Sequence, residues 1–343
     1  MAEEKRRSPL KVAAVVAMYW SISISMVFIM KHLLSGSYGN QDLTIFVTWY
    51  QSASVVVLIL AMSSASRLLK FGLSIPSLDK ETILNSDMLS LSFSFVISLT
   101  MNNLMLKHIS VSFYQVARSL TLIFSILLSF CMLAKAPTYK VVFACLLIIA
   151  GFVIGVDQEE ASGSITIWGI IYGLLASLTS ALTGIYFKKG EYAVGGSALK
   201  LAYINNFNSM MIIFPLVLST NQLSHIMNSD IATNPELWLF LTASGALSLA
   251  IGWASALQIR YTSPVTHQIS INAKSITQTV IAILWNNELK TVFWWFGNVL
   301  VLFGIGIYTF AKYQESKTQK VETSPTPTKN NSSSSSSPEK PTV

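Results

Sequence analysis

Two basic side chains, Arg118 and Lys274, lie inside long apolar stretches of this sequence. A charged side chain at the centre of a bilayer costs about 3 kcal/mol even on insertion scales, so a cation at that depth needs compensation. The sequence has 16 Asp and Glu, and all of them fall in expected loops, tails or helix ends. We therefore expect the missing anion to be a ligand phosphate, because a guanidinium binds phosphate through paired donors and an ammonium acts as a point charge. The alternative is that each cation reaches the interface or an incidental water pocket.

The surroundings of the two cations are repeated. Residues 117–121 (ARSLT) and 273–277 (AKSIT) share three identities and two conservative changes, 156 residues apart. That distance is close to half of the expected membrane body, so the repeating unit contains five helices. An odd unit enters the membrane the second time from the opposite side, and transporters with such inverted repeats bind substrate near the midplane between the halves. The repeat predicts that Arg118 and Lys274 face one central cavity, to which the neighbouring Ser275 also belongs.

A second polar cluster, Tyr203, Asn205 and Asn206, also interrupts an apolar stretch. Adjacent positions on a helix point about 100° apart, so the two amides could address two edges of one ligand. Carboxamides offer donors and acceptors, which is the chemistry that reads a nucleobase, and Tyr203 would add a ring. The alternative is that these amides bond a neighbouring helix. His267 lies near the expected cavity, where polar packing is the simpler interpretation.

The sequence has no pattern typical of catalysis. It contains no paired carboxylates at membrane depth, no His, Cys and Asp at metal-binding spacing, and no Gly-rich loop after a strand. We expect neither enzyme activity nor a cofactor.

The elements that must position these residues are membrane-spanning helices. Hydrophobic residues make up 52% of the chain and charged residues 11%, whereas a soluble surface needs about a quarter charged residues. About 20 mostly apolar residues cross a bilayer core of ~30 Å. The sequence predicts an all-α integral membrane protein with ten transmembrane helices, arranged as two inverted five-helix repeats. Gly297, Gly304 and Gly306 are expected to allow close packing of the last helix. The expected helices cover residues 12–34, 43–64, 87–107, 111–133, 138–156, 165–187, 198–219, 236–258, 264–286 and 291–312.

The distribution of cations predicts the orientation, because Lys and Arg accumulate on the cytosolic side. With a cytosolic N-terminus, only Lys31, Lys107 and Lys290 lie on the opposite side. We therefore expect both termini in the cytosol, and the net charge of +7 reflects this topology rather than nucleic-acid binding. The predicted segments are a cytosolic N-terminus (1–10), a first repeat (11–156), an acidic lumenal loop (157–164), a second repeat (165–312) and a disordered, Ser- and Pro-rich cytosolic tail (313–343).

Several blocks of sequence resemble those of a known family. Over residues 11–315 the chain resembles the GDP-fucose transporters of the Golgi, within the drug/metabolite transporter superfamily. The resemblance implies ten helices in the Golgi membrane, cytosolic termini, and exchange of cytosolic GDP-fucose for lumenal GMP, with a homodimer left open. The blocks are residues 19–28 (YWSISISMVF), 45–51 (IFVTWYQ), 101–121 (MNNLMLKHISVSFYQVARSLT), 151–159 (GFVIGVDQE), 203–206 (YINN) and 263–280 (SPVTHQISINAKSITQTV).

The resemblance also implies roles for individual residues. A motif that contacts guanine in GDP-sugar transporters matches residues 203–206, and a motif that holds the phosphate and sugar region matches residues 270–274, which include Ser270 and Lys274. With these residues, Tyr19, Tyr114 and Asn272 are expected to line the cavity near the base, the ribose or the sugar.

The chain departs from the family pattern at several of these positions. Ile204 replaces a tyrosine, Met30 replaces an asparagine, and residues 270–272 (SIN) stand where relatives have glycine or other small residues. The asparagines and the lysine are retained, whereas the identity of the sugar is open. Transport of GDP-mannose, another nucleotide sugar or a sugar phosphate is an alternative, and so is a non-transporting membrane scaffold.

Overall fold

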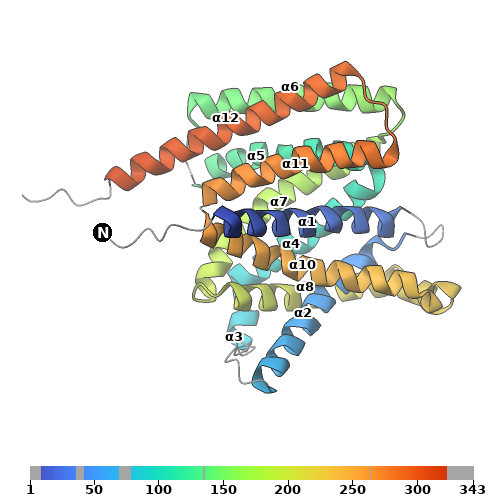
Figure 1. Ribbon diagram of the computed structural model, residues 1–343. Helices are drawn as coiled ribbons and strands as arrows, with labels where there is room; N and C mark the ends of the chain where they lie inside the picture. The colour runs from blue at the N-terminus through green and yellow to red at the C-terminus, as the bar shows by residue number, and fades with distance from the viewer. Residues whose placement is uncertain (1–8, 36–41, 69–78, 134–135, 263, 323–343) are drawn as a thin grey trace, which may run out of the picture.

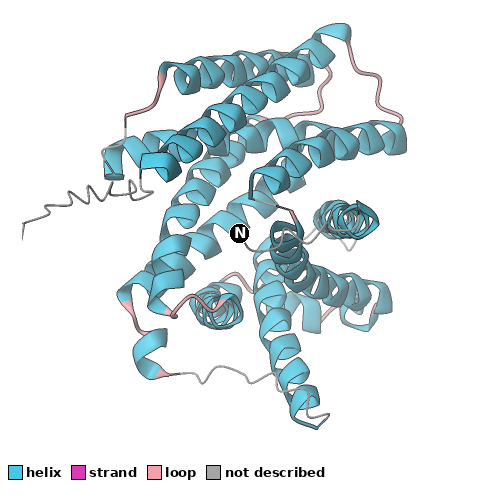
Figure 2. Ribbon diagram, turned by 60° about the vertical axis from the view of Figure 1, so that its left-hand side comes forward, coloured by secondary structure: helices cyan, strands magenta, loops and turns pink. Residues whose placement is uncertain are grey.

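The computed structural model describes residues 9–35, 42–68, 79–133, 136–262 and 264–322. Within these ranges every regular element is a helix (Figures 1 and 2). Three short helical segments are α3 (Lys80–Ile83), α9 (Gln222–Met227) and the 3₁₀ turn η1 (Asp230–Thr233). The ten long helices are α1 (Pro9–Leu34), α2 (Thr44–Leu68), α4 (Ser86–His108), α5 (Val111–Leu133), α6 (Tyr139–Ala161), α7 (Ile167–Ala193), α8 (Ala198–Ser219), α10 (Pro235–Tyr261), α11 (Pro264–Asn286) and α12 (Val292–Glu322).

The long helices match the expected transmembrane stretches. Nine helices in the described part of the chain are long and apolar enough to cross a membrane. Helix α11 is not among them, although it is 23 residues long. Its sequence, PVTHQISINAKSITQTVIAILWN, carries the polar residues from which the site was predicted, and they lower its mean hydropathy. The all-helical membrane fold is therefore confirmed at the level of nine helices.

Polar side chains cap the N-terminal ends of several helices. At the start of α4, Asn85 Oδ1 accepts hydrogen bonds from the backbone N–H groups of Asp87 and Met88. Thr166 Oγ1 accepts from Gly169 N at 3.2 Å before α7, and Asn234 accepts before α10. These bonds satisfy backbone donors that have no partner inside the helix.

Helices from the first half of the chain pack mainly on helices from the second half. The closest partners are α4 with α7, α6 with α12, α1 with α10, α5 with α7, and α2 with α8. Helices α6 and α12 run side by side along one edge of the bundle, and α5 and α11 lie beside them (Figure 1). The two halves are interleaved rather than separate, so residues distant in sequence meet at the centre.

Two helices extend beyond the expected boundaries. Helix α6 continues to Ala161, so the first residues of the predicted acidic loop (157–164) are helical. Helix α12 continues to Glu322, so the first part of the predicted disordered tail (313–343) is helical as well. The rest of that tail, residues 323–343, and residues 1–8 of the predicted N-terminal segment lie outside the described residues.

Glycines allow α6 and α12 to approach each other closely. A Cβ on Gly304 would lie 2.9 Å from the backbone oxygen of Ala144 and 2.8 Å from Ile148 Cγ1. A Cβ on Gly297 would lie 3.0 Å from the backbone oxygen of Gly151. The predicted packing role is confirmed for both residues. It is wrong for Gly306, whose added Cβ would meet nothing within 4 Å, because this residue faces away from α6.

Candidate functional site

A cavity of about 590 Å³ lies at the centre of the bundle, between α1, α2, α4, α5, α7 and α11, with one residue each from α10 and α12. Arg118 of α5 and Lys274 of α11 both line it, although they are far apart in sequence. The other predicted site residues along its wall are Tyr19, Tyr114, Asn272 and Ser275. The structure therefore brings six of the eleven predicted site residues to one cavity.

The two cations have no carboxylate partner in the described part of the chain. Lys274 is only 4% exposed, and its Nζ donates to Ser23 Oγ of α1 at 2.9 Å and to Gln278 Oε1 at 3.5 Å. The Arg118 guanidinium carbon lies 5.6 Å from the centroid of the Tyr114 ring. Neutral oxygens and a ring face compensate a buried positive charge only in part, so the cavity has an excess of positive charge that suits an anion.

His267 and Ser270 lie next to the cavity and do not line it. Ser270 Oγ accepts a hydrogen bond of 2.9 Å from Trp20 Nε1 of α1. His267 Nδ1 is 2.9 Å from Gln258 Oε1 of α10, and the imidazole packs edge-on against Tyr19. In this conformation both side chains tie α11 to its neighbours, and Tyr19, which contacts His267, lines the cavity itself.

The polar cluster of α8 lies away from the cavity. Tyr203 is buried against Val55 and Ile59 of α2. Asn205 Oδ1 accepts from Ser92 Oγ of α4 at 3.1 Å, and Asn206 Nδ2 donates to the carbonyl oxygen of Ala202 in its own helix at 2.8 Å. These are the helix-bonding contacts that the sequence left as the alternative interpretation. Their role toward a ligand stays a prediction.

Five amide side chains that are absent from the site prediction line the cavity, namely Gln51, Asn102, Asn103, Gln115 and Gln268. Asn102 Nδ2 donates to Ser180 Oγ of α7 at 3.1 Å, and Gln115 Oε1 accepts from Ser275 Oγ at 3.2 Å. An amide inside a transmembrane helix more often bonds a neighbouring helix than a ligand. Only the packing of α2, α4, α5 and α11 shows which face of each helix meets the cavity.

The cavity is closed at the end of the bundle where α1 ends. Buried side chains fill this end, among them Leu34, Leu43 and Ile109. Lys31 Nζ donates to three backbone oxygens where α4 ends, at 2.8 Å to Leu106, 3.3 Å to Lys107 and 2.7 Å to Ile109. An ammonium at a helix C-terminus also meets the negative end of the helix dipole, so this contact ties α1 to α4.

An ion pair lies at the same end, between Lys107 Nζ and Asp42 Oδ2 at 3.0 Å. Partial burial alone would raise the pKa of the Asp42 carboxyl. Hydrogen bonds from the hydroxyl and the N–H of Thr44, together with Lys107, outweigh burial and lower that pKa. Asp42 is therefore a stable anion, and it starts α2 by accepting from Thr44.

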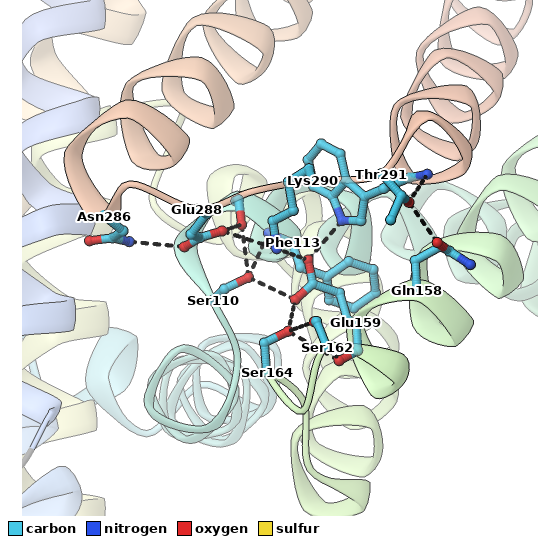
Figure 3. A network of polar contacts seen from close by, with 12 residues as sticks. Ser110, Phe113, Gln158, Glu159, Ser162, Ser164, Asn286, Glu288, Lys290 and Thr291 are labelled. Atoms are coloured by element: carbon cyan, nitrogen blue, oxygen red, sulfur yellow. Dashed lines mark hydrogen bonds and ion pairs between the residues drawn. The ribbon is translucent and has the colours of Figure 1, made fainter.

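A buried network closes the same end between α5, α6 and the segment that joins α11 to α12 (Figure 3). Lys290 Nζ lies 2.5 Å from Glu159 Oε1 and 3.0 Å from Glu288 Oε2, and Glu159 is fully buried. Glu159 also accepts from Trp294 Nε1 at 2.7 Å, and Glu288 accepts from Ser112 Oγ of α5 at 2.7 Å. Burial raises the pKa of Glu288, but hydrogen bonds from Ser112, Asn286 and Lys290 outweigh it and hold that pKa below its ordinary value.

The described residues contain no group of three or more His, Cys, Asp or Glu side chains placed to hold a metal ion. The site therefore offers a ligand two cations, several amides and hydroxyls, and two tyrosine rings. This set binds anions and hydroxyl groups.

Comparison with known proteins identifies the family. A family model described as the Triose-phosphate Transporter family matches residues 10–309. The chain belongs to this transporter family. Similar proteins include GDP-fucose transporter 1 of Nematostella vectensis, which is 38% identical over 317 residues that cover 92% of this chain and 94% of the relative. GDP-fucose transporter 1 of Mus musculus is 38% identical and covers 92% of this chain and 87% of its own. The GDP-fucose transporter of Caenorhabditis elegans is 37% identical, with 94% and 90% covered.

The fold of this triose-phosphate transporter family member also matches a solved crystal structure. The TM-score is 0.53 at 12% sequence identity, and the alignment covers 87% of this chain and 98% of the other. At that identity the likeness shows the fold alone. The matched family model begins in α1 and ends in α12, so the family assignment includes the helices that carry both cations.

Proposed function

We propose that the protein is a nucleotide-sugar antiporter that imports GDP-fucose into the Golgi lumen in exchange for GMP. The observation that carries the proposal is the pair of cations, Arg118 and Lys274, that line one central cavity with no carboxylate beside them in the described residues. Relatives about as long as this chain are named GDP-fucose transporters. Both proposed ligands carry phosphate, so each can compensate the two cations in turn.

Different residues would contact different parts of the ligand. Arg118 and Lys274 would neutralise the phosphates, and Tyr19, Tyr114, Asn272 and Ser275 would line the rest of the ligand. The guanine would be read by Asn205 and Asn206 of α8, with Tyr203 beside them. These three residues lie outside the cavity wall in this conformation, so base recognition requires α8 to move toward the cavity. Such movement is part of alternating access, in which one half of a transporter rocks against the other.

The topology follows from the same proposal. Ten membrane-spanning helices would form two inverted repeats, with α11 as the helix that is too polar for the hydropathy criterion because it lines the cavity. Helix α1 begins and α12 ends on the same side of the bundle, which agrees with an even number of crossings (Figure 1). Both termini would lie in the cytosol. The closed end, where Lys31 contacts α4, would then face the lumen.

The proposed function is tested by whether uptake of GDP-fucose requires GMP on the other side of the membrane. The empty carrier leaves two unpaired cations in a low-dielectric cavity, so it should reorient slowly. Proteoliposomes preloaded with GMP should take up labelled GDP-fucose, and empty proteoliposomes should take up little. Equal uptake by both would refute exchange, and no uptake with no stabilisation by any nucleotide would favour a non-transporting scaffold.

Inhibition of uptake by competing ligands identifies the transported substrate. GMP should inhibit GDP-fucose uptake more strongly than UMP or CMP do, and GDP-mannose should inhibit less than unlabelled GDP-fucose. Stronger inhibition by GDP-mannose, by another nucleotide sugar or by a sugar phosphate would reassign the substrate while leaving the transporter mechanism in place.

A further inference from the structure

Gln51 of α2 is a buried amide on the cavity wall without a strong hydrogen-bond partner in the described residues. The side chain is 3% exposed and lines the cavity near its closed end, with Met30 and Asn103. Its Nε2 donates only to Met30 Sδ, at 3.2 Å. Its Oε1 has no hydrogen-bond partner in the described residues. The amide therefore has unused hydrogen-bonding capacity next to the cavity.

The neighbouring polar residues of α2 do not share this property. Thr48 Oγ1 donates to the carbonyl oxygen of Thr44 and accepts from Asn103 Nδ2 at 2.9 Å. Ser52 Oγ donates to the carbonyl oxygen of Thr48. A thioether is a weak acceptor, so rotating the Gln51 amide by 180° would still leave one end without a good partner. A buried amide in this state is destabilising unless a ligand completes its bonds.

The position of Gln51 relative to Lys274 indicates which part of a ligand it meets. Lys274 Nζ contacts Ser23 of α1, and Met30, the partner of Gln51, lies seven residues further along α1 toward the closed end. At 1.5 Å per residue the separation along the helix is about 10 Å, which leaves room for a hexose ring beyond a phosphate bound at Lys274. Asn205 and the adjacent Asn206 lie nearer the opposite end of the bundle, because Asn205 bonds Ser92 near the start of α4, whereas the last turn of α4 contacts Lys31 at the closed end.

We propose that the Gln51 carboxamide binds a hydroxyl group of the transported sugar and so contributes to recognition of the sugar rather than the nucleotide. This inference rests on the proposed function. A hydroxyl is donor and acceptor at once, so it can bond whichever end of the amide faces the cavity. A site that hydrogen-bonds a substrate hydroxyl also discriminates against analogues that lack it, because the buried amide is then left unpaired.

The test compares two ligands that differ in the sugar. Affinities of GMP and GDP-fucose are measured by ligand-dependent thermal stabilisation of the purified full chain and of Gln51→Met, a side chain of similar length without the amide. The variant should bind GDP-fucose about tenfold more weakly, the loss expected for one hydrogen bond, and should bind GMP as the wild type does. Ser52→Ala is the matched control, because Ser52 is also buried on α2 and does not line the cavity. It should leave both affinities unchanged.

A second measurement starts with the wild-type protein alone and then adds Gln51→Met. Among GDP-fucose analogues that each lack one sugar hydroxyl, one should bind the wild type about tenfold more weakly than GDP-fucose does. Gln51→Met should bind that analogue and GDP-fucose equally well.

Several outcomes would overturn the assignment of Gln51. They are an equal loss of GMP and GDP-fucose affinity in Gln51→Met, no loss for either ligand, or wild-type binding that is indifferent to every missing hydroxyl. Each leaves GMP binding by the wild type intact and therefore spares the proposed function. A wild-type protein that binds neither ligand would instead refute the proposed function, and the assignment with it.

Discussion

At the scale of residues, the site is defined by charges that the protein does not neutralise. Lys274 is nearly as buried as Glu159, but Glu159 has Lys290 at 2.5 Å whereas the Lys274 ammonium contacts only a hydroxyl and an amide oxygen. A buried ion pair that loses one partner is strongly destabilised, because the other charge stays uncompensated. A buried charge without a partner can be removed without that penalty. Substitution of Lys274 should therefore leave the stability intact, whereas substitution of Lys290, the partner of Glu159, should lower it.

Lys274→Met should weaken GMP binding by about 10- to 100-fold, the loss expected for a charge-assisted hydrogen bond, and should not lower the thermal unfolding temperature. Lys290→Met is the matched control. It should lower the stability by about 3 kcal/mol because Glu159 and Glu288 lose their cation, and it should leave GMP affinity unchanged. Thermal unfolding with and without GMP measures both effects. Unaltered GMP binding by Lys274→Met would contradict the phosphate role.

At the scale of elements, the close contact of α6 with α12 supports α5 and α11, the two helices that carry the cations. Gly304 allows this approach because the backbone oxygen of Ala144 lies where a Cβ would stand. Gly306 is two residues away on the same helix and points into open space. The effect of an added methyl group therefore depends on the face of α12 rather than on its depth in the membrane.

Gly304→Ala should destabilise the protein by roughly 1–3 kcal/mol through overpacking against the backbone of α6. Gly306→Ala should be neutral or slightly stabilising, by roughly 0.5–1 kcal/mol, because alanine loses less conformational freedom in a helix than glycine does. Thermal unfolding in detergent compares the two variants. Equal destabilisation by both substitutions would contradict the packing role of Gly304, because the effect would then not depend on the contact of α12 with α6.

At the scale of the whole molecule, contacts close the cavity at one end. Some of these contacts join the two halves of the chain, and others lie within the first half. Lys31 ties α1 to the end of α4, and the Glu159 network ties α5 to the segment between α11 and α12. Alternating access requires this end to open, so these contacts must break during the cycle. Each of them contributes to the free-energy difference between the closed and open conformations.

Lys31→Met should make the closed end open more often, because three hydrogen bonds to α4 are lost. A cysteine placed at the buried Leu34 reports the change through its reaction rate with a membrane-impermeant thiol reagent. The rate should rise by about 10-fold or more in Lys31→Met, since a charge-assisted hydrogen bond contributes ~1.5–3 kcal/mol. Lys107→Met is the control, and the loss of its exposed ion pair with Asp42 should change the rate little. An unchanged rate in Lys31→Met would exclude Lys31 from gating.

The sequence by itself determined the helices and the central charge. Apolar runs of about 20 residues must be helical in a bilayer, because only a helix satisfies every backbone hydrogen bond within one segment. Arg118 and Lys274 could be recognised because a cation at membrane depth is costly wherever the helix points. The repeat singled out both residues, and the family resemblance added a role for Lys274.

Only the tertiary structure decided which uncharged residues meet the cavity. Gln51 and Asn205 are both amides on apolar helices, yet Gln51 lines the cavity and Asn205 bonds Ser92 on α4. The sequence could not separate them, because a neutral amide is satisfied equally well by a ligand or by an adjacent helix. It also placed Glu159 in an acidic loop, whereas α6 continues through this residue and buries it against Lys290 and Trp294. Helix rotation and helix ends depend on long-range packing, and the packing of two interleaved halves is not a property of either half alone.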